Sequence, residues 1–259
     1  MNSSLKKIAL ERLVKFVVNI LKAEYQKTKR SMRRRFVWAF PMITFALAFV
    51  LTLGMANVYA ESVWNWWYTL LLPGMLAIIC HLSMTQEKKT NYFHLMAFST
   101  SKRKLMMGKI IYMGCVVLAS NIIVFAGASL GGFLLTTRVP LGGAAVTVLL
   151  LTATQLWEIP VFLFLSERFG MIAELLICLF LTVGGIIIAP TGKWYLLVSA
   201  VPMRILCPFL HILPNGIPAE VGNPLLDRGV VVPGICLSII WFIIAIILFL
   251  NWFEKREVK

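Results

Sequence analysis

Apolar residues in this chain gather into six long runs, separated by short polar or basic segments. A helix needs about 20 apolar residues to cross the hydrocarbon core of a membrane, and each run is close to that length. The pattern therefore predicts six membrane-spanning helices, at Phe36–Tyr59, Trp66–Met84, Gly108–Leu135, Ala144–Leu165, Met171–Ala189 and Val230–Leu250. The predicted fold class is all-α, a polytopic membrane protein.

The basic residues predict how these spans are oriented. Eleven Lys and Arg residues precede residue 36, and a six-span topology places 21 of the 25 on the side of the N-terminus. Because basic segments stay on the cytoplasmic side, we expect a multi-pass protein of the bacterial cytoplasmic membrane with both termini inside. The domains predicted are residues 1–35, a membrane domain at 36–252 and a tail at 253–259. The net charge of +14 lies in these membrane flanks, which argues against a nucleic-acid partner.

The segment before the first span has the pattern of an amphipathic helix. Apolar residues such as Leu5, Ile8 and Phe16 recur at helical spacing, with lysines between them. Such a helix lies along the inner leaflet, where its cations face lipid phosphates. Two interpretations stay open here, an electrostatic anchor and a helix that also contacts a cytoplasmic partner.

The longest inside loop between spans is Thr85–Lys104, which has charges at both ends and an apolar middle. Reconnecting two helices takes only a few residues. Exposed aromatic residues flanked by charge therefore favour a short helix that docks into a groove on another protein. The alternative is a loop that rests on the membrane.

The segment Pro190–Pro233 holds seven of the eleven prolines and is nonetheless apolar. Its pieces are too short to span, so they predict re-entrant or outer-interface helices. They would form either an outer gate or a packed extracellular loop. Trp64, Trp66 and Trp67 are expected to form an aromatic belt at the outer interface.

Two carboxylates interrupt the apolar spans. Glu158 lies in the fourth span, one turn after Gln155, and Pro160 predicts a local break of the helix there. An ionisable group inside a membrane indicates function or a buried interhelical hydrogen bond, and both interpretations stay open. Glu174 lies one turn into the fifth span and is expected to reach the inner interface.

No catalytic constellation is present. The chain has no GxSxG, HExxH or GxxxxGK[ST] motif, and its three His and five Cys residues have no metal-ligand spacing. We therefore expect a protein that is not an enzyme, with no cofactor or metal bound by this chain. A secondary transporter is disfavoured because no repeated motif relates the two halves.

The chain resembles the ABC-2 type permeases, and more narrowly the permease subunits of lantibiotic-immunity transporters (MutE/EpiE type). The resemblance covers essentially the whole chain. It is carried by LKAEYQKTKRS at Leu21–Ser31, QEK at Gln86–Lys88, SKRKLMMGK at Ser101–Lys109, QLWEIPVFLFLSERFG at Gln155–Gly170, PMRILCPFLHILPNGIP at Pro202–Pro218 and NWFEKRE at Asn251–Glu257.

The resemblance implies a six-helix permease fold (type V exporter-like) that pairs with a second permease and an ABC ATPase dimer. ATP and Mg would bind in that ATPase. The complex would expel cationic lantibiotic peptides from membrane lipids. Alternatives are export of another drug or peptide, and a non-transporting membrane sensor. Residues implied in coupling to the ATPase are Gln86, Glu87, Lys88, Tyr92, Phe93, His94 and Leu95; those implied in an outer gate at 190–229 are Trp194, Arg204, His211, Pro214 and Asn215.

Overall fold

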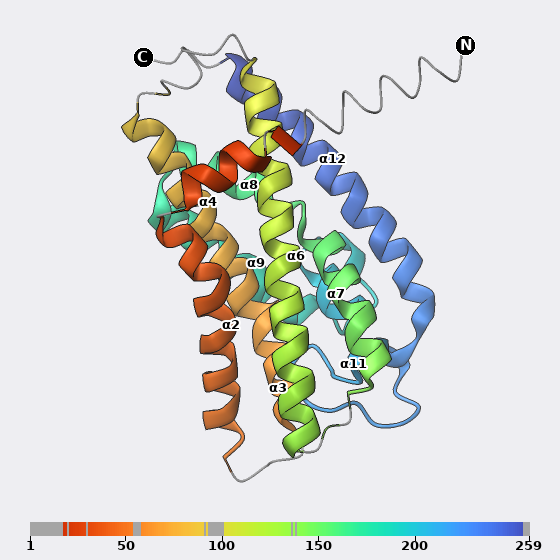
Figure 1. Ribbon diagram of the computed structural model, residues 1–259. Helices are drawn as coiled ribbons and strands as arrows, with labels where there is room; N and C mark the ends of the chain where they lie inside the picture. The colour runs from red at the N-terminus through yellow and green to blue at the C-terminus, as the bar shows by residue number, and fades with distance from the viewer. Residues whose placement is uncertain are drawn as a thin grey trace, which may run out of the picture.

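The computed structural model describes residues 18–255, apart from residues 20, 30, 54–57, 91, 93–100, 136 and 138. The described part is almost wholly helical and contains no β-strand. After a helical segment at residues 21–28, the main helices form one bundle (Figure 1). They are α2 (Met32–Leu51), α3 (Tyr59–Trp66), α4 (Leu72–Lys89), α6 (Lys102–Leu135), α7 (Leu141–Gln155), α8 (Glu158–Arg168), α9 (Met171–Ile188) and α12 (Val231–Lys255).

The predicted fold class is confirmed. Five helical stretches are long and apolar enough to cross a membrane, and the bent pair α7–α8 makes a sixth. The boundaries predicted for the first two spans are wrong, because α2 already ends at Leu51 and the next helix begins at Tyr59. The apolar run continues through the turn between these helices, so hydropathy alone could not mark where the first helix ends.

The second span is the centre of the bundle. It runs without interruption from Tyr59 to Lys89 and is the most buried of the candidate spans. A π-helical turn at Trp67–Leu71 joins α3 to α4. Pro73 explains it, because proline has no N–H to donate to the carbonyl four residues earlier, and the turn widens instead.

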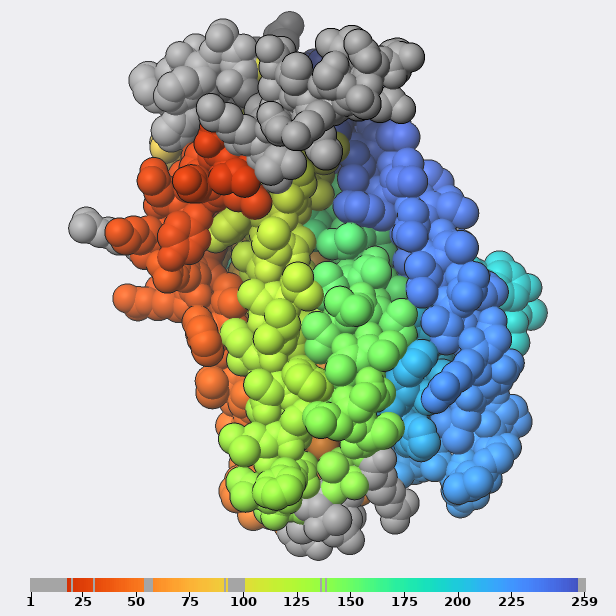
Figure 2. Space-filling view, turned by 45° about the vertical axis from the view of Figure 1, so that its right-hand side comes forward, coloured from red at the N-terminus to blue at the C-terminus, as the bar shows by residue number. Residues whose placement is uncertain are grey.

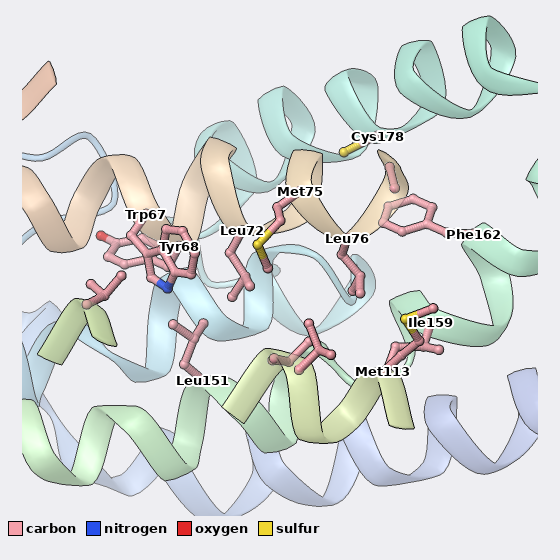
Figure 3. Close-up of a cluster of buried hydrophobic side chains, with 14 of the residues drawn as sticks. Trp67, Tyr68, Leu72, Met75, Leu76, Met113, Leu151, Ile159, Phe162 and Cys178 are labelled. Carbon is pink, nitrogen blue, oxygen red and sulfur yellow. The ribbon is translucent and has the colours of Figure 1, made fainter. Parts of the chain in front are cut away.

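Large side chains of this central span form the core. In Figure 3, Trp67, Leu72, Met75 and Leu76 lie between Met113 of α6, Leu151 of α7, Ile159 and Phe162 of α8 and Cys178 of α9. Trp64 and Trp67 are 0% exposed, and the Trp67 indole Nε1 donates to Asn121 Oδ1 at 2.8 Å. The expected aromatic belt at these two residues is therefore wrong, because they fill the interior.

The fourth span is broken where the sequence predicts it. Helix α7 ends at Gln155, α8 begins at Glu158, and the two are bent by 43°. Pro160 cannot donate a hydrogen bond to the Leu156 carbonyl, which accepts one from Ile159 N instead at 3.2 Å.

Short helices fill one end of the bundle between α9 and α12. Helices α10 (Ala200–Ile205) and α11 (Cys207–Leu210) are almost fully buried and pack against α7, with α10 also contacting α9 and α12. Three 3₁₀ turns flank them, η3 (Trp194–Leu196), η4 (Pro224–Leu226) and η5 (Arg228–Val230). The proline-interrupted pieces are thus packed helices too short to span.

The outward faces of the long helices are apolar. On α9, Ile172 and Phe180 are 78% and 72% exposed, and the outer row of isoleucines on α12 is likewise uncovered. Helices α6, α7 and α12 lie side by side on the face shown in Figure 2. Apolar surface on this scale belongs in lipid or at a subunit interface rather than in water, so the protein is a multi-pass membrane protein.

Candidate functional site

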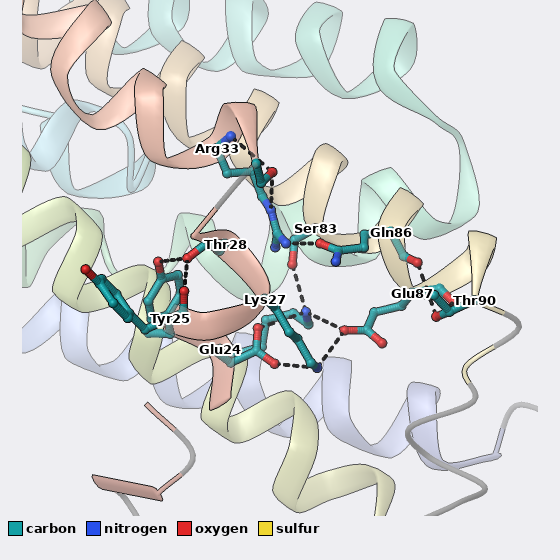
Figure 4. A network of polar contacts seen from close by, with 12 residues as sticks. Glu24, Tyr25, Lys27, Thr28, Arg33, Ser83, Gln86, Glu87 and Thr90 are labelled. Carbon is teal, nitrogen blue, oxygen red and sulfur yellow. Dashed lines mark hydrogen bonds and ion pairs between the residues drawn. The ribbon is translucent and has the colours of Figure 1, made fainter. Parts of the chain in front are cut away.

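The most polar part of the interior lies at one end of the bundle, where residues 21–28, the C-terminal half of α4 and the first turns of α6 meet (the top of Figure 1). We call it the basic end. Four charged side chains from three helical segments form a network there, together with one serine (Figure 4). The polar node is defined as Glu24, Lys27, Ser83, Glu87 and Lys109.

Lys109 of α6 is the centre of the polar node. Its ammonium is 0% exposed and contacts Ser83 Oγ at 2.8 Å, Glu87 Oε1 at 3.0 Å and Glu24 Oε2 at 3.4 Å. An ammonium has three protons to donate, and three oxygens accept them here. Lys109 thereby fastens α6 to α4 and to the helical segment at residues 21–28.

Lys27 makes the node electrically neutral. Its Nζ lies 2.8 Å from Glu24 Oε1 and 3.1 Å from Glu87 Oε1, so two cations share two carboxylates. Burial alone would raise the pKa of Glu24, but Lys109 and Lys27 lower it below the usual 4.5. Burial alone would lower the pKa of Lys27, but Glu24 and Glu87 raise it above the usual 10.5. Both groups are thus charged around neutral pH.

Further polar contacts beside the polar node join α4 to α2, and the segment at residues 21–28 to α6. The Arg33 guanidinium of α2 donates to Gln86 Oε1 of α4. The hydroxyls of Thr28 and Tyr112 of α6 are hydrogen-bonded at 2.7 Å. Ser31 caps α2, accepting from Arg33 N at 3.3 Å. The turn between residues 21–28 and the first span is therefore held on both sides.

A second cluster joins the end of α4 to α8. The Lys88 ammonium lies 3.3 Å from Glu167 Oε2, and the Tyr92 hydroxyl donates to Glu167 Oε1 at 2.6 Å. Tyr92 N also donates to the Glu87 carbonyl at 2.9 Å, just beyond the end of α4. Tyr92 has a φ of 52°, a conformation that non-glycine residues rarely adopt.

The C-terminus of α12 contacts both ends of the loop that links α4 to α6. The Tyr92 ring packs on Phe253 with centroids 6.2 Å apart. At the other end of the loop, Arg103 pairs with Glu254 at 3.4 Å and donates to Asn251. Residues at both ends of this loop therefore contact the C-terminal part of α12.

Of the residues predicted to couple to an ATPase, the structure brings four together at the end of α4, namely Gln86, Glu87, Lys88 and Tyr92. Phe93, His94 and Leu95 lie outside the described residues. Glu24, Lys27, Lys109 and Glu167 were not predicted from the sequence. Lys109 comes five residues after Lys104, so the charge pattern alone groups it with the membrane-flanking cations, although an isolated lysine among apolar residues of a helix is itself a signal for burial.

The pH dependence of stability provides a test of the polar node. Glu24→Gln should lower the free energy of unfolding by about 1.5–3 kcal/mol at pH 7, because it removes charged hydrogen bonds. Since the folded pKa of Glu24 is lowered from 4.5, its contribution is complete above pH 4.5 and is lost as the pH falls further. Melting temperatures of the wild type and variant should therefore converge in acid. A difference that grows in acid would contradict this assignment.

A second polar site lies at the break of the fourth span. The side chains of Glu158 and Gln155 are buried, and Glu158 Oε2 and Gln155 Oε1 have no hydrogen-bond partner among the described residues. Both residues line a cavity of about 10 Å³, close to the minimum that admits one water molecule, together with Tyr68, Cys178, Thr182 and Ser199.

Glu174 lies deeper than the sequence predicts. Its side chain is 0% exposed, and Oε2 lies 3.7 Å from His81 Nδ1, which is also 3.1 Å from Ser166 Oγ. The expectation that this carboxylate reaches the interface is therefore wrong. Packing of α9 against α4 and α8 encloses it.

Glu87 of the polar node and Glu158 at the helix break are in different environments, so replacing each by the uncharged glutamine should have opposite effects on stability. Glu87→Gln should lower the melting temperature, because both Lys27 and Lys109 lose a partner. Glu158→Gln should leave it unchanged or raise it, because the described residues offer the buried carboxylate no ion pair. Thermal unfolding of the purified protein in detergent measures both. A Glu158→Gln variant that melts well below the wild type would show that Glu158 has a stabilising partner.

The residues predicted for an outer gate lie at the opposite end of the bundle. The Arg204 guanidinium is buried and donates to the Leu225 carbonyl at 2.6 Å, and His211 ends α11 in a left-handed conformation. The Pro214 carbonyl accepts a hydrogen bond from Asn65 Nδ2 at 3.4 Å. Trp194 packs against the core and Tyr195, whereas Asn215 turns its side chain to its own loop, at Ile217 N.

Fold and site together define a polytopic α-helical membrane protein whose charged groups gather where the loop at residues 90–101 leaves the bundle. Residues 20–185 match the sequence model of the ABC-2 family transporter proteins. Because the match covers more than half of the 259 residues, the chain belongs to the ABC-2 transporter family. No curated protein and no solved structure matches it significantly. Proteins of this family form the membrane permease of a transporter and are not themselves catalytic, and membership implies an ABC ATPase as partner. The matched region includes the whole polar node.

Proposed function

We propose that this chain is the permease subunit of an ATP-driven exporter that removes cationic lantibiotic-type peptides from the membrane and so confers immunity or resistance. A separate ABC ATPase dimer binds ATP and Mg. A second permease subunit completes the membrane part. The basic end faces the cytoplasm, where the ATPase contacts the loop at 85–104.

One observation carries the coupling part of this proposal. The last turn of α4, which forms the start of the segment at 85–104, contacts α2 through Gln86, α6 and residues 21–28 through Glu87, and α8 through Lys88. Ion pairs and packed helices are rigid connections. A push on this loop therefore displaces several spans as one unit rather than bending a single helix.

The peptide specificity rests on the resemblance in sequence and on charge. Glu158 stands at the helix break, in the middle of a span, and a carboxylate at such a place is suited to a cationic group that passes during transport. The segment at 190–229 would close the opposite end of the pathway. In this arrangement Glu158 becomes accessible only when α8 moves away from α4 and α9, which enclose it.

The test is resistance in a sensitive bacterium that expresses this chain with its partner subunits, with either an active ATPase or one unable to hydrolyse ATP. Protection against lantibiotics, but not against unrelated drugs, that disappears with the inactive ATPase is the expected result. Protection that survives the inactive ATPase would favour a membrane sensor or sequestration. Protection against other compounds alone would indicate a different export substrate.

Coupling is tested in the same cells with substitutions in the loop. Phe93→Ala and Leu95→Ala should reduce resistance and the substrate-stimulated ATPase rate while leaving the amount of folded permease unchanged. Lys89→Ala is the matched control, because Lys89 is an exposed cation at the same end of α4. Full resistance in the Phe93 and Leu95 variants would refute coupling through this loop.

A further inference from the structure

Exposed cations gather where the helical segment at residues 21–28 leads into α2, at the edge of the molecule (red, at the left of Figure 2). With two exposed aromatic residues beside them they form the cationic patch, which is defined as Lys22, Lys29, Arg34, Arg35, Tyr25 and Trp38. Among the described residues, no carboxylate pairs with any of these four cations, whereas Arg103 at the same end of the bundle is paired with Glu254. The patch therefore carries four positive charges that no described residue compensates.

The segment at residues 21–28 has two opposite faces. Glu24 and Thr28 are buried on the face that meets the polar node and α6. Lys22, Tyr25 and Lys29 are three and four residues apart, which places them together on the other face. Tyr25 is 46% exposed, and its ring points away from the polar node (Figure 4). One short helix thus separates the cationic patch from the polar node.

Arg34 is held in place by Tyr25. Its guanidinium carbon lies 4.9 Å from the centroid of the Tyr25 ring, the geometry of a cation–π contact. Such stacking uses the flat face of the guanidinium and leaves the N–H groups at its edge available. That edge matches two oxygen atoms of a phosphate group.

The side of α2 that carries Arg34 continues as an apolar surface. Arg34, Trp38 and Met42 follow one another at intervals of four residues, and the last two are 57% and 51% exposed. Exposed tryptophans mark the boundary between hydrocarbon and headgroups. Arg34 lies about one turn, or ~5 Å, beyond Trp38, and the headgroup layer is about 5–8 Å thick on each side of the hydrocarbon core. Arg34 is therefore at the level of the lipid phosphates.

Charge decides what covers this surface. A second copy of this chain would bring the same four positive charges to the contact, and like charges repel. A zwitterionic phospholipid offers no net negative charge. An anionic phospholipid supplies the missing charge and has acyl chains for the apolar row, and each Lys or Arg near such a lipid strengthens binding about fivefold.

We propose that the cationic patch binds the headgroup phosphate of an anionic phospholipid in the leaflet at the basic end. Arg34 and Arg35 hold the phosphate, Lys22 and Lys29 add charge, and an acyl chain lies along Trp38 and Met42. The bound lipid holds the segment at residues 21–28 against the bundle from the side opposite the polar node. This site depends neither on the ATPase nor on the identity of the exported substrate.

The experiment uses the full chain purified in detergent and native mass spectrometry, which counts bound lipid molecules. Phosphatidylglycerol is compared with phosphatidylcholine of the same acyl chains. We expect the first phosphatidylglycerol to bind about tenfold more tightly or better, and millimolar glycerol phosphate to leave it bound. Equal affinities for the two lipids would overturn the proposal. Displacement by glycerol phosphate would overturn it too, because the site would then serve a soluble phosphate.

A pair of double variants tests whether the site is local. Arg34→Gln with Arg35→Gln should weaken phosphatidylglycerol binding about 25-fold, fivefold for each charge, and leave phosphatidylcholine binding unchanged. Arg168→Gln with Lys255→Gln removes the same charge from exposed positions on α8 and α12. This control should change the affinity by about twofold or less, because salt screens distant charges. The same loss in both double variants would show a response to net charge and would refute a defined site.

Two further measurements do not depend on the removal of charge. Tyr25→Leu takes away the stacking partner of Arg34 and should weaken phosphatidylglycerol binding about twofold to fivefold, whereas Tyr25→Phe keeps the ring and should bind as the wild type does. Phosphatidylglycerol should also raise the melting temperature of the wild type, but not that of the Arg34→Gln, Arg35→Gln variant. A rise that persists in this variant would place the lipid elsewhere and contradict the proposal.

Discussion

Lys109→Met should destabilise the protein more than any other single substitution at the basic end. The methionine fits the volume, but Glu24 and Glu87 then share only Lys27, and one buried negative charge is left without compensation. Removing one partner of a buried ion pair typically lowers the free energy of unfolding by about 3–5 kcal/mol. We expect a strongly reduced yield of monodisperse protein and a lower melting temperature in detergent.

A rescue experiment separates charge balance from packing. Adding Glu87→Gln to Lys109→Met restores neutrality of the polar node, so the double variant should recover part of the lost melting temperature even though each single change is destabilising. Such non-additivity is the signature of direct interaction. Lys89→Met, at an exposed position on α4, should be close to neutral. Additive losses in the double variant would show that Lys109 does not act through Glu87.

Gly143→Ala should disrupt the opposite end of the bundle. A Cβ atom at this position of α7 would lie 2.1 Å from the backbone oxygen of Phe209 in α11. A side chain could rotate away, but a carbonyl moves only with its helix, so α7 and α11 must separate. Overpacking of this kind lowers stability by about 1–3 kcal/mol, and we expect a lower melting temperature together with loss of resistance.

The preceding residue provides the matched control. Gly142 occupies the same first turn of α7, and nothing lies within 4 Å of a Cβ added there. Gly142→Ala should therefore be neutral or stabilising by about 0.5–1 kcal/mol, the usual advantage of alanine over glycine in a helix. Equal melting temperatures for the two variants would contradict the close approach of α7 and α11.

The spans could be predicted because the membrane requires long apolar helices, and Pro160 marked the break in the fourth span for a simple steric reason. The ends of the first two spans could not, because the apolar run continues through residues 52–58. Nor could the burial of Trp64 and Trp67, because tryptophans are common both at membrane interfaces and in interiors. Only the contact between Trp67 and Asn121 reveals which applies here. Likewise, only the structure shows that Phe45 of α2 and Tyr59 of α3 occupy the space beside Gly127 and Gly131 of α6.

The polar node illustrates a different limit. Gln86, Glu87 and Lys88 could be singled out because the resemblance to the ABC-2 permeases implies coupling residues in that segment. Their partners Glu24, Lys109 and Glu167 are separated from them by many residues, and each looks like an ordinary flanking charge by itself. Pairing across such distances depends on how the helices pack, and hydropathy carries no information about that.

Because Lys109 contacts both Glu24 and Glu87, the order of synthesis also determines when the segment at residues 21–28 can pack against the bundle. Glu24 and Glu87 are both synthesised before Lys109, and the separation in sequence between Glu24 and Lys109 is 85 residues. Until the third span has been inserted, the two carboxylates have only Lys27 between them. The segment at residues 21–28 can therefore reach its final place only after the ribosome has passed residue 109. A chain truncated before that point should leave this segment open to proteases, whereas one that includes the third span should protect it.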